Sequence, residues 1–353
     1  MTITSGQELS RQVKELGEFY TREKFSNLDC RNLDFSGAIF VEVEFNNCDF
    51  SGANLSEAAF TKCTFNNAKF IKAALKETVF TNTDLSAADF SSSTMIETKF
   101  IDLQCKAINL SGCVFESVVF ANSFLADGML DHMTVKTSVF NNCKFTGVVF
   151  NDSNHYKSIF NDCEFGNNVF TKVTIQLSCF FKANFNGVDF SGLDLKQIQF
   201  SDCNLLGCDF TSSVLTQAGF MKADLSDSKF DGANAELANF SEAILGSVSM
   251  SKMNLSKAGM QKTKISQSDF RSTNFEMCQL TESVITNSLF SGSDFTYADF
   301  SHASVEGSDF SNTNLKGAKM HEFYDEDTLW EAANRADAQK TDPVKLKAEK
   351  WGK

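Results

Sequence analysis

Residues 35–60 read FSGAIFVEVEFNNCDFSGANLSEAAF, and a large apolar side chain returns at every fifth residue. The same count holds without insertion or deletion from Phe25 to Met320. Of the 60 positions in this range whose numbers are multiples of five, all but four are Phe, Leu, Ile, Val or Met. The four exceptions are Cys30, Cys105, His155 and Ala235. One short period over most of 353 residues predicts a repeat architecture.

A period of five residues matches neither an α-helix, which repeats every 3.6 residues, nor a strand, which repeats every two. We call the multiple-of-five residue the centre of each pentad. The residue two before the centre is mostly small, as at Ala38, Cys48 and Ala53. The pattern therefore predicts a chain that turns a corner once per pentad and points one large and one small side chain inward.

Several pentads resemble the Ala-(Asp/Asn)-Leu-x-x unit of the pentapeptide-repeat proteins, notably 50–55 (FSGANL), 190–195 (FSGLDL) and 221–225 (MKADL). The resemblance implies the fold of that family, an all-β solenoid in which four pentads make one coil of a right-handed quadrilateral β-helix. Sixty pentads then imply about 15 coils. Residues 20 apart would stack, so the columns that contain Phe40 and Phe50 predict two opposed stacks of aromatic rings.

The loss of the period at both ends predicts three parts. These are a helical cap over 1–24, the β-helix over 25–320, and a helical cap with a mobile tail over 321–353. Ser5 and Glu8 resemble a capping box, which favours a helix over about 6–19. At the other end a helix is expected over 331–340, with Pro343 as its stop.

Four apolar side chains near the C-terminal end have two interpretations. They cover the last coil, or they join two rods into a dimer, as the C-terminal helix does in the gyrase-binding branch of the family. The chain is accordingly expected to be a monomer or a C-terminal homodimer. These candidate cap or dimer residues are Phe323, Tyr324, Leu329 and Trp330.

Eight of the eleven Cys residues occupy the small inward position, where they are expected to act as buried apolar groups. A metal site at Cys143 and Cys163 is disfavoured because no His or second Cys pair joins them. Many free thiols without a secretory signal favour the cytoplasm. No apolar run reaches membrane-spanning length, and no metal or other cofactor is expected.

The sequence contains no recognisable catalytic constellation: it has no Gly-rich phosphate loop, no nucleophile elbow and no HExxH motif. His155 is the one His at a centre, where a satisfied core histidine is favoured over a functional irregularity. We therefore expect a protein that is not an enzyme.

The formal net charge is −13, and acidic residues recur just before the centre. Such a surface disfavours direct nucleic-acid binding and favours a basic partner that itself binds DNA. The alternative is that the acidity only keeps a Phe-rich protein soluble. The candidate acidic surface comprises Asp189, Asp194, Asp209, Asp224, Asp269, Asp294 and Asp309.

Between about 114 and 179 the positions just before the centre become apolar, and Phe181 follows just after a centre. These side chains predict a partner-binding waist. The alternative is that these side chains only add β-propensity to the strands. The candidate partner surface comprises Phe124, Phe181, Val119, Val139, Ile159, Val149 and Val169.

Two functions follow. The first is a non-enzymatic rod that binds a protein partner through its surface. The alternative, implied by the resemblance to the Phe-rich branch of the family, is a DNA mimic that binds a type II topoisomerase. Such a protein modulates or protects DNA gyrase or topoisomerase IV and gives immunity to an antibiotic or a toxin. The great length of the repeat and the absence of loops between pentads depart from that branch.

Overall fold

The computed structural model describes residues 3–166, 168 and 170–351. The chain divides into two compact units, Met1–Cys179 (unit 1) and Phe180–Lys353 (unit 2). In each unit, equivalent residues of successive coils pair in parallel, for example Phe40 with Phe60 and Ile265 with Ile285. The predicted β-helix, with about 15 coils and a helix toward each end of the chain, is thereby confirmed.

Each coil has four faces, which we name by their centres. The centres of Face A are multiples of 20, as in Phe40. The centres of Faces B, C and D are the next three multiples of five in turn, as in Phe45, Phe50 and Leu55. On every face the centre points inward, and the residues just before and just after it lie on the outer side.

The corner between two faces lies two residues after the centre. The backbone there has a positive φ in nearly every pentad, as at Gly37 (72°) and Asn47 (53°). Glycine, asparagine and aspartate tolerate this conformation best, which explains why Gly recurs at the position. Many corners are closed by a bond such as that from the Ala53 N–H to the Phe50 carbonyl (3.0 Å). The Phe50 N–H in turn donates to the backbone carbonyl of Lys69 in the next coil at 2.7 Å.

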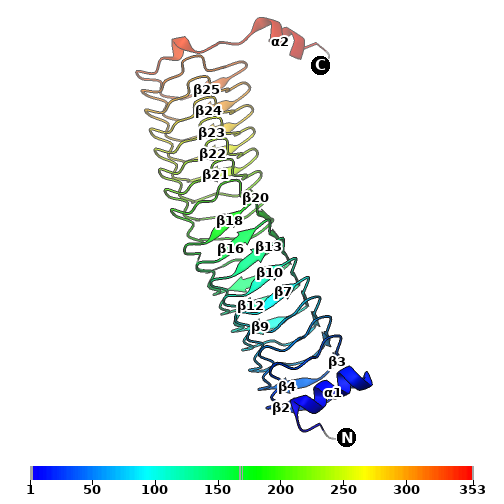
Figure 1. Cartoon of the computed structure of the whole chain (residues 1–353). Coiled ribbons are helices and arrows are strands. Elements are labelled where there is room, and N and C mark those ends of the chain that lie inside the picture. The colour runs from blue at the N-terminus through cyan, green and yellow to red at the C-terminus, as the bar shows by residue number, and fades with distance from the viewer. Residues whose placement is uncertain (1–2, 167, 169, 352–353) are drawn as a thin grey trace. The chain divides into compact units, whose positions relative to one another are not determined.

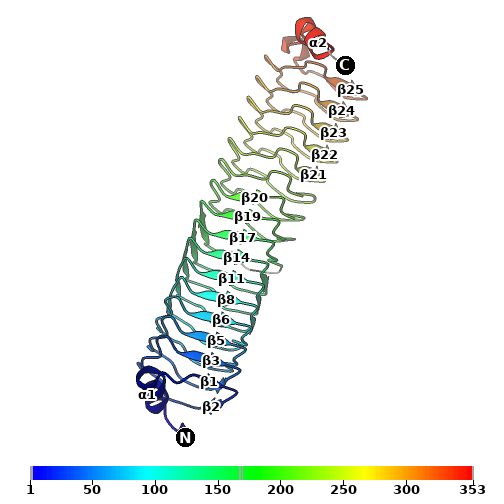
Figure 2. The ribbon, with the colours of Figure 1, turned by 90° about the vertical axis from the view of Figure 1, so that its right-hand side faces the viewer.

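The strands of unit 1 are short, and each pairs in parallel with the strand at the same place in an adjacent coil. Figure 2 shows the Face A strands one above another. Face A contains β1 (Tyr20–Thr21), β3 (Ile39–Val41), β5 (Ala59–Thr61), β6 (Val79–Thr81), β8 (Lys99–Ile101), β11 (Val119–Ala121), β14 (Val139–Asn141) and β17 (Ile159–Asn161). Face B contains β2 (Lys24–Ser26), β4 (Glu44–Asn46), β9 (Gln104–Lys106), β12 (Phe124–Ala126) and β15 (Lys144–Thr146). Face D contains β7 (Thr94–Ile96), β10 (Val114–Glu116), β13 (Thr134–Lys136), β16 (Asn154–Tyr156) and β18 (Thr174–Gln176).

Unit 2 contains a ladder of five strands on Face B, which Figure 1 shows stacked in order. These are β21 (Ile244–Gly246), β22 (Lys264–Ser266), β23 (Val284–Thr286), β24 (Ser304–Glu306) and β25 (Tyr324–Glu326). β20 (Gln199–Ser201) belongs to Face A, and β19 (Cys179–Phe181) spans the division between the units. Isolated parallel bridges continue the same pairing elsewhere, as between Asp189 and Asp209.

The core of the first coils is a set of stacked rings. Phe40 and Phe60 of Face A stack with centroids 5.4 Å apart and planes at 6°. Phe50 and Phe70 of Face C stack at 5.3 Å and 7°. The two predicted ring stacks are therefore present. Face B also stacks rings in this region, because Phe45 has a Phe at the same place in both adjacent coils.

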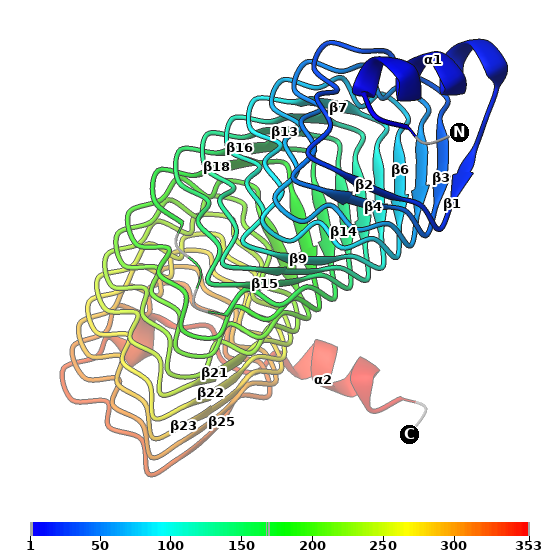
Figure 3. The ribbon, with the colours of Figure 1, turned by 90° about the horizontal axis from the view of Figure 1, so that it is seen from below.

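Helix α1 (Gly6–Leu16) lies against the coil that opens unit 1, as Figure 3 shows. Ser5 caps it by accepting from the Glu8 N–H at 3.2 Å, and Gly17 ends it with φ 68°. Within this helix Leu9 is fully buried, and the Ser10 hydroxyl donates to the Asp34 carbonyl at 2.7 Å. The expected N-terminal helix is therefore present, but it ends at Leu16, earlier than predicted.

The C-terminal end differs from the expectation. The repeat runs past Met320, because β25 pairs with β24 and Lys319 forms a bridge with Gln339. No α-helix forms within 331–340, which lies wholly in the described part of the chain and contains only a 3₁₀ turn, η1 (Arg335–Asp337).

Pro343 begins helix α2 (Pro343–Glu349) instead of ending a helix. Proline suits the first turn, which needs no N–H donor, and Asp342 caps that turn by accepting from Val344 at 2.8 Å. Neither helix is long and apolar enough to cross a bilayer, within the residues that the structure describes.

Candidate interaction surfaces

The outer side of Face A in unit 1 carries an apolar row, which we call the A ladder. Its residues stand just before the centre on neighbouring strands and pair in register. The A ladder comprises Ile39, Ala59, Val79, Val119, Val139 and Ile159. Lys99 interrupts it between Val79 and Val119. A second row on the same strands, just after the centre, runs from Val41 to Asn161 and includes Ile101 and Ala121. Lys99 is the one charged side chain on the seven strands from β3 to β17 of this face, all of which are described.

This composition is unusual for an exposed sheet surface. All-parallel sheets are normally covered on both sides, and their strands then read as continuous apolar runs. Strand β3 reads Ile-Phe-Val and β11 reads Val-Phe-Ala. The inward Phe is buried, yet Ile39 and Ile159 are 50% and 46% exposed. The A ladder thus has the composition of a covered sheet and an open outer side.

An acidic row borders the N-terminal half of the A ladder. Glu57, Glu77 and Glu97 lie at the same corner of three successive coils, where the chain turns from Face D into Face A. All three are exposed, and Lys76 pairs with Glu77 at 3.3 Å. Glu57 and Glu97 form no ion pair with any described residue. We call these three residues the acidic rim.

The predicted waist is not one surface, because four successive pentads lie on four different faces. Val119, Val139 and Ile159 lie together on the A ladder, whereas Phe124 belongs to Face B and Val149 to Face C. Phe181 belongs to unit 2, and Val169 lies outside the described residues.

The sequence reasoning missed Ile39, Ala59 and Val79, which lie before the region that was singled out. Sorting the residues before each centre by face, one coil at a time, would have found them. The period of five alone does not separate the four faces.

The seven predicted acidic residues also divide among faces, all within unit 2. Asp189, Asp209, Asp269 and Asp309 belong to Face C, Asp194 and Asp294 to Face D, and Asp224 to Face B.

Each of these seven carboxylates accepts a hydrogen bond from the backbone N–H two residues on, at 2.8 to 3.3 Å. The same bond is made by Asn where Asn stands before the centre, as from Ser241 to Asn239. Where Asp or Asn stands before the centre, its oxygen therefore supports the corner, and the negative charge is not needed for this bond.

The aromatic pair Phe323 and Trp330 packs on the last coils of unit 2. The rings of Trp330 and Phe310 lie 4.8 Å apart, and those of Phe323 and Phe300 lie 5.9 Å apart. Asp325, at a centre position, accepts from the Trp330 indole N–H at 3.0 Å and pairs with Arg335 at 2.8 Å. This packing matches the interpretation in which these residues cover the last coil.

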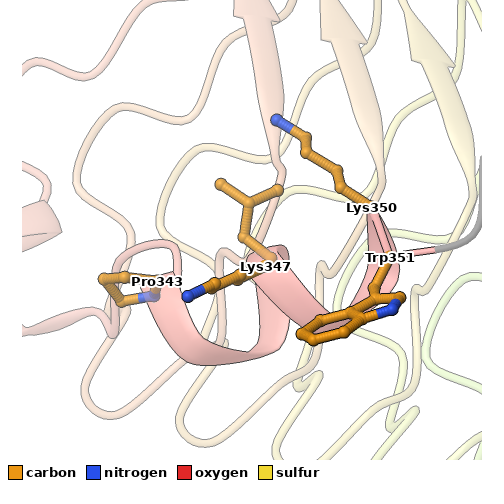
Figure 4. A pocket seen from close by; sticks show the side chains of 5 residues that line it. Pro343, Lys347, Lys350 and Trp351 are labelled. Carbon is orange, nitrogen blue, oxygen red and sulfur yellow. The ribbon is translucent and has the colours of Figure 1, made fainter.

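Tyr324 and Leu329, the other two candidates, point outward and are 55% and 62% exposed. Helix α2 carries a shallow hollow of about 470 Å³, shown in Figure 4. Its lining comes only from the 343–351 segment, including Lys347 and the exposed Trp351. The hollow therefore belongs to one helix surface and does not enclose a ligand.

The thiols and His155 lie inside the solenoid, apart from one thiol. Ten of the eleven thiols are buried, and Cys179 is partly exposed. Burial raises the pKa of Cys63 to about 11 and that of Cys113 to about 12. Burial also lowers the pKa of His155 to about 4. At neutral pH these side chains are uncharged core groups.

Three family models match the chain. A pentapeptide repeat region matches residues 133–210, and pentapeptide repeats of eight copies match 29–67, 63–102, 218–256 and 236–271. Pentapeptide repeats of nine copies match 260–318. Together the matches cover more than half of the chain. No curated protein matches it.

Three solved structures illustrate the range of similarity. A pentapeptide repeat protein from the Arabidopsis thaliana thylakoid lumen is 29% identical over 32% of this chain and 68% of its own, with a TM-score of 0.24. HetL, involved in heterocyst differentiation regulation in the cyanobacterium Nostoc sp., is 18% identical over 62% and 91% (TM-score 0.25). QnrB1, a plasmid-mediated fluoroquinolone resistance protein, is 22% identical over 62% and 90% (TM-score 0.27). Scores this low establish no residue correspondence, so no residue role is transferred from these structures.

Proposed function

Because this chain belongs to the pentapeptide-repeat proteins, we propose that it is a non-enzymatic interaction protein whose docking surface is the A ladder of unit 1. The observation that supports this function is the outer side of Face A, which carries the apolar A ladder and one charged side chain over seven paired strands. The inward positions are filled by packed side chains, which leaves no interior site for a substrate among the described residues.

The partner presents an apolar strip with lysine or arginine along one flank. The apolar strip covers the A ladder and removes Ile39 and Ile159 from water, which is favourable in proportion to the area buried. The basic flank meets the acidic rim, where Glu57 and Glu97 form no ion pair with any described residue. Charge complementarity of this kind sets the orientation and the rate of association.

The test compares variants that differ only in the face they change. Immobilised full-length protein is exposed to cell extract, and the proteins it retains are quantified by mass spectrometry. Val119→Glu combined with Val139→Glu places two charges on the A ladder. Val149→Glu, on Face C of the same unit, is the matched control. Circular dichroism verifies that each variant keeps the fold.

We expect at least one retained protein to fall more than tenfold with the double variant and to remain with the control. Retention of that protein should also fall with Glu57→Lys combined with Glu97→Lys, and it should weaken as salt rises. If every retained protein binds the double variant as well as the unchanged protein, the A ladder is not a docking surface.

The second candidate function is protection of DNA gyrase or topoisomerase IV by a DNA mimic. The net charge of −13 and the neighbouring Asp189 and Asp209 of Face C support it. Asp→Asn substitution keeps an acceptor oxygen for the corner hydrogen bond and removes the charge, so it separates the two roles of these residues. A mimic should alter gyrase supercoiling, and the set Asp189→Asn, Asp209→Asn and Asp269→Asn should abolish that effect. The absence of any effect by the unchanged protein would exclude the mimic.

We also propose a reducing compartment, with the cytoplasm as the simplest choice. Ten buried thiols serve here as small apolar core groups. Cys163, for example, donates to the Phe140 carbonyl at 3.4 Å. A reducing environment protects such thiols during folding, before they are buried.

A further inference from the structure

Two histidines and a glutamate meet near the C-terminal end of unit 2. His302 occupies a corner after Face A, and His321 follows one coil later just after a Face A centre. The two lie on adjacent coils because the His302 N–H donates to the His321 carbonyl at 2.8 Å. Helix α2 brings Glu349 to the same place.

The three side chains point ligand atoms at one another. The Nε2 atom of His321 lies 3.1 Å from one carboxylate oxygen of Glu349, and Nε2 of His302 lies 3.4 Å from the other. One ligand atom from each residue can be chosen so that all three lie within 4.8 Å of one another. Tetrahedral zinc, with bonds of about 2.0 to 2.2 Å, requires ligand atoms about 3.4 Å apart. The separation between His321 and Glu349, 3.1 Å, is already close to that size.

The surroundings of the cluster also suit an ion. His321 is 5% exposed, which fixes its ring, whereas His302 and Glu349 are partly exposed and leave a path for entry. A cavity of about 240 Å³ adjoins His321 and is bordered by Asp299 and Asp342, so water can supply a fourth ligand.

We propose that His302, His321 and Glu349 bind one Zn²⁺ ion, which fastens α2 to the last coils. Two imidazoles and one carboxylate form a donor set that Zn²⁺ takes readily, and the fourth position stays open to water. This site is independent of the docking function assigned to the A ladder. Its role is to hold the C-terminal helix in place.

The metal-free cluster competes with the ion in two ways. The Asp342 N–H donates to Nδ1 of His321 at 3.1 Å, so the ring proton lies on Nε2 and is donated to Glu349. Binding Zn²⁺ at Nε2 moves that proton to Nδ1 and breaks the bond from Asp342. The Lys345 ammonium, 3.6 Å from the Glu349 carboxylate, is also displaced. Removal of Lys345 should therefore strengthen binding, whereas removal of any ligand should weaken it.

The experiment titrates full-length protein with ZnCl₂ against a colorimetric zinc indicator, in the presence of a non-thiol reductant. We expect one ion per chain. His302→Asn, His321→Gln and Glu349→Gln should each weaken binding at least tenfold, and Lys345→Ala should tighten it about two- to tenfold. Asn suits position 302 because it tolerates the φ of 62° there.

The matched control is His132→Gln. His132 also occupies a corner and lies 3.5 Å from an oxygen of Asp131, but it belongs to unit 1. This variant should bind Zn²⁺ as the unchanged protein does. Hydrogen exchange gives a second readout: Zn²⁺ should slow exchange of the 344–349 amides at least fivefold, and this slowing should disappear in Glu349→Gln. Glu349 is on a surface helix, so its substitution leaves the solenoid folded.

Two results would overturn the proposal. One is the absence of saturable binding up to 100 µM Zn²⁺. The other is binding that Glu349→Gln and His321→Gln leave unchanged, which would assign the ion to other surface groups.

Discussion

The ring nitrogen Nε2 of His155 lies 3.1 Å from the Ser153 hydroxyl oxygen in the core of unit 1. Ser153 gives its own proton to the Phe150 carbonyl at 2.7 Å, so it can only accept from His155. The single ring proton of neutral His155 therefore lies on Nε2. The other nitrogen, Nδ1, is buried and has no hydrogen-bond partner among the described residues. The one histidine at a centre position is only half satisfied.

Replacement of His155 by leucine should stabilise unit 1. The column above and below it is aliphatic, with Val135 and Ile175 as the paired residues. A buried acceptor without a partner costs about 1–3 kcal/mol, and leucine removes it at similar volume. We expect the free energy of unfolding to rise by about 1–2 kcal/mol in urea titrations.

The companion variant Ser153→Ala should have the opposite effect, because it leaves the His155 N–H unpaired as well. A loss of about 1–2 kcal/mol is expected. Destabilisation by His155→Leu would show that the imidazole makes a favourable contact in the core.

The same residue makes stability depend on pH. Burial lowers the pKa of His155 to about 4, against about 6.5 for an exposed imidazole. Above pH 6.5 His155 is neutral in both the folded and the unfolded protein. Between pH 6.5 and pH 4 it binds a proton only in the unfolded protein. The free energy of unfolding should therefore fall as the pH falls from 6.5 toward 4, by about 2 kcal/mol at pH 5.

Carboxylates titrate in the same range, so the effect of His155 is measured as a difference. Urea unfolding at pH 7.5 and pH 5.0 is compared between the unchanged protein and His155→Leu. The leucine variant should lose about 2 kcal/mol less on acidification, since it has no imidazole to protonate in the unfolded state. Equal losses in the two proteins would mean that the buried ring binds a proton in the folded state.

The corner at Thr137 is a site of backbone strain. Its φ is 49°, and it is the one β-branched residue with a positive φ among the described residues. Side chains that branch at Cβ tolerate this conformation poorly. Thr137→Asn should raise the free energy of unfolding by about 0.5–1 kcal/mol, since Asn occupies the corner at 142 with a similar φ.

The control for the corner is Thr134→Asn, earlier in the same pentad repeat and within strand β13. There threonine suits the extended backbone, and asparagine should destabilise. Thermal unfolding followed by circular dichroism measures both variants. Higher stability of Thr134→Asn or lower stability of Thr137→Asn would contradict the assignment of strain to the corner.

The sequence predicted the solenoid well, because Phe at every fifth position is compatible with few other backbones. It predicted the partner surface poorly for a related reason. Residues on the same face recur only once per coil, whereas successive pentads lie on different faces. Val119 and Phe124 are therefore close in sequence but lie on different faces. The end of the repeat was also misplaced. Asp325 breaks the apolar pattern although the coil continues, since its carboxylate is satisfied by two partners further along the chain.

That arrangement leads to the last prediction. Asp325→Ala removes the acceptor of the Trp330 indole and the ion-pair partner of Arg335, which also lies 4.6 Å from the Trp330 ring. Bonds to a charged group contribute about 1.5–3 kcal/mol when buried, and partial exposure reduces this to about 1–2 kcal/mol. The last coil should therefore open more often, and amides of β25 should exchange about 5- to 30-fold faster.

The control is Glu331→Ala, which changes an exposed acidic residue in the same coil and should leave the exchange rates unchanged. Asp325→Asn should restore part of the protection through its remaining acceptor. Equal exchange in Asp325→Ala and Glu331→Ala would show that the aromatic packing of Trp330 on Phe310 holds the coil without the carboxylate.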